Sequence, residues 1–243
     1  MELGLRGRVA VVTAASRGLG RATADALAAE GAHLVIAARG EEALAAATAQ
    51  LREAGAEVVP VVADVTDPDV PGELVQAALE HFGRLDVVVA NAGGPPPGRA
   101  LEVDDERLRA ALEANLLASV RLVRHAVPPM TEAGWGRICC VTSYTIVQPA
   151  PTLALSNTAR TALWAWAKTA AQDLARSGSG ITLNLACPGP HATDRMRELG
   201  ATAGTPMGDP GDFGRIVTFL CSEPAAFVNG AALVIDGGST LAL

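Results

Sequence analysis

Short apolar runs recur along the chain and alternate with longer Ala-rich stretches that carry polar residues at intervals. The apolar runs are nearly continuous, which is typical of strands covered on both faces. We predict strands at residues 8–13, 33–38, 57–62, 85–90, 137–142, 181–186 and 231–235. The stretches between them predict helices at 18–30, 41–54, 69–82, 104–130, 152–176 and 210–222.

Local signals refine these elements. Pro128 and Pro129 predict a break near the end of helix 104–130, and Thr152 is a candidate cap for the next helix. Residues 93–98 are Gly/Pro-rich and predict a loop, and residues 188–208 predict an irregular segment with one helical turn. Strand–helix alternation without a linker predicts one domain over residues 1–243, built on a parallel sheet. The expected fold is a doubly wound Rossmann-type α/β domain with seven parallel strands in the order 3-2-1-4-5-6-7 and helices on both faces.

Composition narrows the function classes. The net charge is −7, whereas proteins that bind nucleic acids or anionic membranes carry an excess of basic residues. No apolar run is long enough to span a bilayer. The N-terminus does not resemble a secretory signal, so we expect a cytoplasmic protein. Cys139 and Cys140 are adjacent within a strand and suit neither zinc nor a disulfide, so the four cysteines are expected to be buried thiols and no metal site is predicted.

The turn after the first strand suggests a phosphate-binding loop. It reads Thr13-Ala14-Ala15-Ser16-Arg17-Gly18-Leu19-Gly20 and leads into a helix. Glycines at 18 and 20 let the backbone approach a pyrophosphate at the helix N-terminus. An ordinary tight turn is the alternative, but the position at the first strand–helix turn of an alternating chain favours a dinucleotide site.

Residues after the next strands point to the adenosine end of the dinucleotide. The second strand ends in Ala37-Ala38-Arg39, where an NAD-binding protein would carry a carboxylate for the ribose. Arg39 and Arg17 suit a 2′-phosphate, which favours NADP(H), although either arginine alone is also consistent with solvated surface. Asp64, followed by Val65, suits the adenine amino group, and Asn91-Ala92-Gly93 allows close backbone passage.

In order and spacing, these residues resemble the short-chain dehydrogenase/reductase family, and the resemblance covers nearly the whole chain. It rests on residues 13–20, Asp64, Asn91-Ala92-Gly93, Asn115, Ser143, Pro188-Gly189 with Thr193, and Asp236-Gly237-Gly238. The branch it resembles includes β-ketoacyl carrier-protein reductases and carbonyl reductases. The resemblance implies that Pro188, Gly189 and Thr193 bind the nicotinamide end. Ala14 departs from the family, which has glycine there.

The catalytic positions implied by the resemblance are unusual. Ser143 matches the serine that polarises the carbonyl, and Asn115 matches the asparagine that holds a water. The tyrosine and lysine positions, however, hold Ser156 and Arg160. Their i, i+4 spacing keeps both on one helix face, but serine is a far weaker acid than a phenol and arginine stays charged. Tyr144 and His191 are the alternative candidates for the proton donor. The competing interpretation is a packing role for Tyr144 and a solvated loop position for His191.

Three functions follow as candidates. The first is an NADP(H)-dependent oxidoreductase that acts on a carbonyl or alcohol with an atypical proton source. The second is a non-catalytic NADP(H)-binding partner subunit, and the third is a lyase or isomerase on the same scaffold. The expected partners are a small-molecule substrate, beneath a short lid at residues 191–207, and further copies of the chain. The resemblance implies a dimer or tetramer through helices 104–130 and 152–176, and the apolar residues 241–243 are a further candidate contact.

Overall fold

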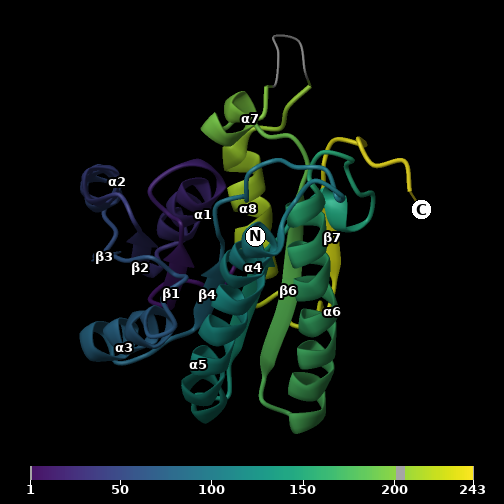
Figure 1. Cartoon of the computed structure of the whole chain (residues 1–243). Helices are drawn as coiled ribbons and strands as arrows, with labels where there is room; N and C mark the ends of the chain where they lie inside the picture. The colour runs from purple at the N-terminus through teal and green to yellow at the C-terminus, as the bar shows by residue number, and fades with distance from the viewer. Residues whose placement is uncertain (1, 201–205, 243) are drawn as a thin grey trace.

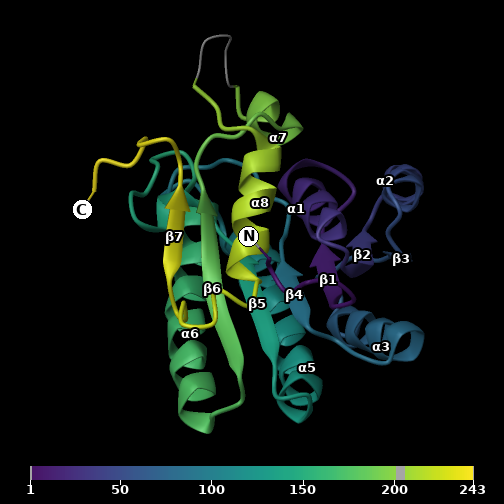
Figure 2. The same ribbon diagram turned by 180° about the vertical axis from the view of Figure 1, so that it is seen from behind.

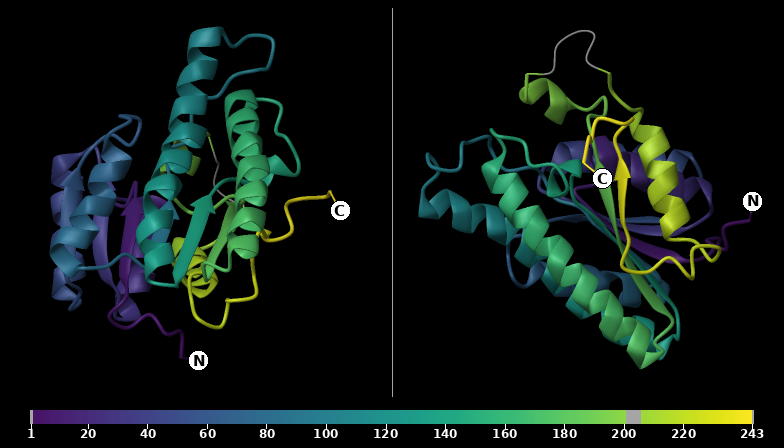
Figure 3. Two further views of the ribbon diagram at one scale, coloured as in Figure 1. Left: turned by 90° about the horizontal axis from the view of Figure 1, so that it is seen from below. Right: turned by 90° about the vertical axis from the view of Figure 1, so that its right-hand side faces the viewer.

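The computed structural model describes residues 2–200 and 206–242 as three layers, with a parallel sheet between two layers of helices (Figures 1 and 3). The strands are β1 Val9–Thr13, β2 His33–Ala38, β3 Val58–Val62, β4 Val87–Ala90, β5 Gly136–Val141, β6 Ile181–Pro188 and β7 Ala232–Ile235. Their order is β3-β2-β1-β4-β5-β6-β7, and every pair is parallel. This confirms the predicted fold class and strand order.

The helices on one face of the sheet are α3 Val70–Phe82, α5 Ala118–Glu132 and α6 Ala154–Ser177 (Figure 1). The opposite face is covered by α1 Gly18–Ala29, α2 Glu41–Glu53 and α8 Pro210–Leu220 (Figure 2). Each face has its own apolar core. Cys139 faces one core and Cys140 the other, as expected for neighbours on a strand.

The order reverses between β1 and β4, so the chain leaves the sheet in opposite directions on either side of this pair. In open α/β sheets, ligands bind beyond the carboxyl ends of the strands at such a switch point. The loops after β1, β4, β5 and β6 all emerge at this edge, and the short helix α7 Asp194–Glu198 stands above it (Figure 1). The topology therefore places the residues predicted to bind the cofactor and substrate at one edge.

The prediction of a break at the prolines was wrong. Helix α5 continues through Pro128 and Pro129 to Glu132, and the irregularity lies earlier, where α4 Asp105–Leu112 passes into a π-helical turn at Glu113–Leu117. Each proline lacks an N–H for the carbonyl four residues before it, but Arg124 and His125 lie on the exposed side of the helix, where water can take over. The fully buried Met130 anchors the turn beyond.

The predicted cap of α6 was also wrong. Leu153, not Thr152, occupies the N-cap position, and no side chain caps the helix. Gly98 N instead donates to the Thr152 carbonyl at 2.8 Å, and Ala154 N donates to the Gly98 carbonyl at 3.2 Å. The Pro-rich loop therefore fixes the start of α6 through backbone pairing.

Two predicted features extend beyond the described residues. Residues 201–205 of the expected lid and Leu243 of the expected C-terminal contact are outside the described residues.

All four cysteines are buried and unpaired, and burial raises the pKa of the Cys140 thiol to about 12. Within residues 2–200 and 206–242, no helix is both long and apolar enough to cross a membrane, and no cluster of side chains has the composition of a metal site.

Candidate active site

The loop after β1 is held tightly against the end of β4. Thr13 Oγ1 donates to the Asn91 carbonyl at 2.7 Å and accepts from Asn91 N at 2.8 Å. A Cβ on Gly20 would lie 2.3 Å from the Ala14 carbonyl oxygen and 2.7 Å from Asn91 Nδ2. Only glycine fits such an approach, so the packing of α1 against this loop requires Gly20.

The N-terminus of α1 is open to a ligand. Arg17 is its N-cap residue, and no side chain caps the first turn, which also carries no acidic residue. The unpaired N–H groups and the helix dipole together make such an end an anion site. Ala14, just before it, has a φ of +49°, the left-handed region where an alanine is strained and the family's glycine would not be.

Polar groups at the carboxyl ends of β2 and β3 face each other. Arg39 Nη1 lies 3.6 Å from Asp64 Oδ2, and both side chains are largely solvated. Partial burial acts to raise the pKa of Asp64, but hydrogen bonds from Thr66 N and Oγ1, together with Arg39, hold that pKa below its ordinary value. Asp64 therefore stays ionised at neutral pH, and Arg39 keeps most of its surface available to a ligand.

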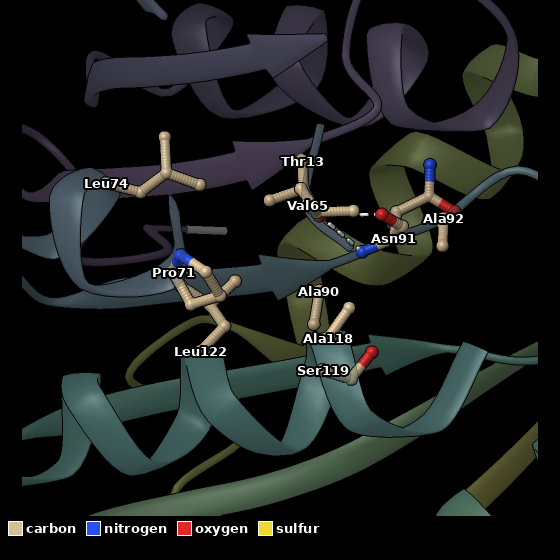
Figure 4. A pocket seen from close by; sticks show the side chains of 10 residues that line it. All are labelled: Thr13, Val65, Pro71, Leu74, Ala90, Asn91, Ala92, Ala118, Ser119 and Leu122. Atoms are coloured by element: carbon tan, nitrogen blue, oxygen red, sulfur yellow. Dashed lines mark hydrogen bonds between the residues drawn. The ribbon is translucent and has the colours of Figure 1, made fainter. Parts of the chain in front are cut away.

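A small cavity lies behind the end of β4 (Figure 4). Its volume of about 10 Å³ is close to the room that one water needs. The residues that line it come from the ends of β1 and β4, from the loop after β3 and from α3 and α5, and they include Thr13, Val65, Asn91, Ala92 and Ser119. The structure thus brings the predicted residues Thr13, Val65, Asn91 and Ala92 together.

Ser143 follows β5 and begins the 3₁₀ turn Tyr144–Ile146. Its Oγ accepts hydrogen bonds from Thr145 N at 3.2 Å and from Thr145 Oγ1 at 3.0 Å. Both bonds use the oxygen as an acceptor, so the Ser143 hydroxyl proton is left to donate to another group. This is the polarity that a group polarising a carbonyl needs. Tyr144 is half-buried in the same turn, and its role as a donor stays a prediction.

Asn115 lies in the π-helical turn between α4 and α5. Its Nδ2 donates to the Ala111 carbonyl at 3.4 Å, whereas its buried Oδ1 has no hydrogen-bond partner among the described residues. A buried amide oxygen without a partner is costly, and π turns often mark functional positions. The geometry suits the water-holding role that the family resemblance implies for Asn115.

Ser156 and Arg160 are both buried on α6, at 9% and 7% exposure. Arg160 Nη1 donates to the Val141 and Thr142 carbonyls at 2.8 and 2.9 Å, and Nη2 contacts the Ala92 carbonyl at 3.5 Å. Burial, and to a smaller extent the nearby charge of Arg195, together lower the Arg160 pKa to about 10. Arg160 is therefore still charged at neutral pH and is fixed beside Ser143.

The segment after β6 returns to the phosphate loop. A Cβ on Gly18 would lie 3.7 Å from Thr193 Cγ2, so the predicted nicotinamide segment and the predicted pyrophosphate loop are neighbours. Gly189 N donates to the Ile235 carbonyl at 2.9 Å, and a Cβ there would meet Asp236 at 2.5 Å. Close packing against the end of β7 thus requires the glycine after Pro188.

The interpretation of His191 as a solvated loop residue was wrong. Its side chain is buried, its Nδ1 lies 3.0 Å from the Gly189 carbonyl, and its ring packs edge-on against Phe213 with centroids 5.3 Å apart. A Cβ on Gly208 would lie 2.9 Å from the same ring. These contacts give His191 a packing role beneath the lid and weaken its candidacy as a proton donor.

Arg195 on α7 lies beside the predicted site residues, and the sequence did not reveal this contact. Its Nη2 donates to the Pro95 carbonyl at 2.6 Å, so it joins the lid to the Pro-rich loop. A Cβ on Gly94 would lie 3.1 Å from Arg195 Nε, which shows how closely the guanidinium lies on that loop. Nothing in the local sequence distinguishes Arg195 from Arg197, because both occupy the same polar five-residue helix.

Comparison with known proteins identifies the family. A family model described as Enoyl-(Acyl carrier protein) reductase matches residues 13–240. Dehydrogenase/reductase SDR family member 4 of Bos taurus is 33% identical over 247 residues, covering 97% of this chain and 88% of that protein. The chain belongs to the short-chain dehydrogenase/reductase family.

Two further members of the short-chain dehydrogenase/reductase family extend the comparison. Cis-4-hydroxycyclohexanecarboxylate dehydrogenase of Sinomonas cyclohexanicum is 37% identical over 249 residues, covering 96% of both chains. The crystal structure of L-sorbose reductase from Gluconobacter frateurii, complexed with NADPH and L-sorbose, superposes with a TM-score of 0.93 at 32% identity over the whole of both chains. The family expected from the motifs is thus confirmed over the whole length of the domain.

Proposed function

We propose that this protein is an NADP(H)-dependent oxidoreductase that interconverts a carbonyl compound and its alcohol. The observation that carries the proposal is the N-terminus of α1, which no side chain caps and which follows β1 at the switch point of the sheet. Ala38 stands where a carboxylate would select the free ribose of NAD. The structure of L-sorbose reductase with NADPH supports the same choice of cofactor.

The phosphate loop would hold the dinucleotide by its backbone. The N–H groups of Ser16, Gly18, Leu19 and Gly20 would bind the pyrophosphate, and Thr13 holds the loop to the end of β4. Arg17 and Arg39 would hold the 2′-phosphate, since guanidinium groups pair with phosphate through parallel hydrogen bonds. Asp64 and Val65 would line the adenine end.

The nicotinamide end would lie between the loops after β4 and β6. Asn91, Ala92 and Gly93 would line one side, and Pro188, Gly189 and Thr193 the other. Thr193 would bind the carboxamide, which agrees with its contact position opposite Gly18. When bound, the cofactor supplies or accepts the hydride.

Ser143 and Arg160 would act on the substrate oxygen. The Ser143 hydroxyl has its proton free to donate, and the fixed Arg160 charge lies against the two residues before it. Together they would stabilise negative charge that develops on the substrate oxygen. Ser156 is too weak an acid to supply the proton, so we assign the proton to a water held by Asn115 Oδ1, and that water regains a proton from bulk solvent.

The direct test is NADPH oxidation with a panel of simple ketones. We expect measurable turnover, and Ser143→Ala should lower kcat by roughly 10²–10³, as for loss of one oxyanion donor, without changing the Kd for NADPH. Ser177→Ala, at the far end of α6, is the matched control and should leave the rate unchanged. Equal rates for Ser143→Ala and the unaltered chain would refute the assigned role.

A second function has specific support. Ser156 and Arg160 stand where the family resemblance places tyrosine and lysine, and this favours a non-catalytic NADP(H)-binding subunit. Tight NADPH binding, with no oxidation of NADPH by any ketone in the panel, would support the non-catalytic subunit. Turnover that depends on Ser143 would select the oxidoreductase.

We also propose that the protein forms a dimer or tetramer. Phe227 is fully exposed beside the edge strand β7, and Leu233 on that strand is also exposed. In contrast, Trp164 and Trp166 on α6, one of the helices expected at the interface, pack partly against the core of their own chain. Light scattering of the purified chain tests the assembly, and Phe227→Asp should shift it toward the monomer.

A further inference from the structure

Arg160 is a buried positive charge without a carboxylate partner among the described residues. Its guanidinium is held by the carbonyl oxygens of Val141, Thr142 and Ala92. Carbonyl dipoles satisfy its N–H groups but do not neutralise its charge. A buried charge without a counter-ion is costly, so an arrangement of this kind is best explained by an anion that arrives from outside the chain.

A second guanidinium approaches the same place from the lid. Arg195 Nη2 donates to the Pro95 carbonyl, three residues after the Ala92 carbonyl that Arg160 contacts. Arg195 is about one-third exposed, and its one acidic neighbour in the described chain, Glu198, is more exposed and lies 3.5 Å away. Arg160 on α6 and Arg195 on α7 thus contact carbonyl groups of the same short loop, three residues apart.

The two charges repel each other. After burial, the proximity of Arg195 is the next cause of the lowered Arg160 pKa; the Cys187 thiol opposes that shift, and no carboxylate contributes to it. The chain as a whole carries a charge of −7, so this positive pair stands out against an acidic background. An anion bound beside both guanidinium groups would remove the repulsion and use N–H donors that remain available.

We propose that the substrate carries a carboxylate, which Arg195 binds directly while the charge of Arg160 reinforces the attraction. The inference rests on the proposed oxidoreductase, whose reacting carbonyl lies at Ser143. Arg195 reaches the site from α7, so the carboxylate is held on the lid side of the substrate, away from the reacting carbon. Ketones or alcohols with a remote carboxylate are the expected class.

Binding is measured without turnover by calorimetry on the NADPH-loaded protein. The probes are cyclohexanecarboxylate and its uncharged isostere cyclohexanecarboxamide, which carry no ketone. We expect the carboxylate to bind about 10–100-fold more tightly, which corresponds to one charge-assisted contact. Arg195→Gln should reduce this preference to about threefold or less, whereas Arg197→Gln, on the same helix and paired with Asp194, should retain it.

Turnover supplies the second arm, with 4-oxocyclohexanecarboxylate and 4-oxocyclohexanecarboxamide as substrates. Equal binding of the two cyclohexane probes, or a preference that survives Arg195→Gln, overturns the inference. Weaker NADPH binding by Arg195→Gln with no preference for carboxylate also overturns it, because the anion is then a cofactor phosphate. Arg195-dependent carboxylate binding without reduction of either ketone supports the anion site and refutes the oxidoreductase, so the two failures are distinguishable.

Discussion

The double variant Ser156→Tyr with Arg160→Lys tests whether the site keeps reductase geometry. It introduces a phenol and an ammonium on the same face of α6, one helical turn apart. If protonation of the substrate oxygen limits the rate, a positioned general acid should raise kcat for ketone reduction by about 10²–10⁴. The gain is expected because Ser143 and the cofactor residues are left unchanged.

The same change should lower stability. Arg160 reaches the Val141 and Thr142 carbonyls with one nitrogen and the Ala92 carbonyl with another, which the single nitrogen of lysine cannot reproduce. We expect a loss of about 1–3 kcal/mol for this change. Tyrosine at the buried position 156 adds about 1–3 kcal/mol of overpacking. In a chain of 243 residues, each kcal/mol lowers Tm by about 2–4 °C.

The assay is steady-state NADPH oxidation below the lowered Tm, with folding checked by circular dichroism and cofactor binding by fluorescence. The matched control is Ser156→Phe with Arg160→Lys, which has nearly the same volume but no phenolic proton. A double variant that folds, binds NADPH and yet is no faster than the phenylalanine control would refute the reasoning. A variant slower than the unaltered chain would show that Ser156 and Arg160 have a positive role.

Three further predictions follow from single groups. Gly20→Ala places a Cβ 2.3 Å from the Ala14 carbonyl, so it should cost about 1–3 kcal/mol in denaturant unfolding and weaken NADPH binding; unchanged values of both would contradict the tight loop. Asp86→Ala removes a fully buried carboxylate that accepts from Val9 N and from two arginines, and it should cost about 3–5 kcal/mol, with no change in NADPH affinity. The Arg160 pKa of about 10 predicts a flat rate profile between about pH 6 and pH 9 and a fall above about pH 10. Above about pH 10 the folded chain loses a proton that the unfolded chain keeps, so the contribution of Arg160 to stability should rise with pH there. A titrating limb near pH 7 in the rate would contradict the assignment.

The fold was predictable because its signals are periodic and local. Continuous apolar strands, Ala-rich helices and the turn after β1 depend on burial and backbone freedom, which sequence displays directly. The π turn at Asn115 was not predictable, because it inserts one residue into a helix without changing its composition. The uninterrupted α5 depends on whether water reaches the carbonyls before Pro128 and Pro129, and this is a tertiary property.

The candidate site was predictable for the polar residues that come directly after a strand. It was less predictable for residues whose positions depend on packing against distant parts of the chain. Gly18 and Thr193 are far apart in sequence but adjacent in space, as the family resemblance implied. The burial of His191 depends on Phe213 from another element, and the contact of Arg195 depends on a loop 100 residues away. Long-range contacts of single side chains leave no pattern in one sequence.

Fluorescence titration with NADPH and NADH tests the cofactor assignment most directly. We predict that NADPH binds about tenfold more tightly than NADH. The preference is no larger because Arg39 is largely solvated, and a solvated guanidinium–phosphate pair contributes only modestly to binding. Arg39→Asp should remove most of this preference, while the same charge change at Arg6, an exposed residue of the loop before β1, should not. Equal affinity for the two dinucleotides in the unaltered chain, or no binding of either, would contradict the account.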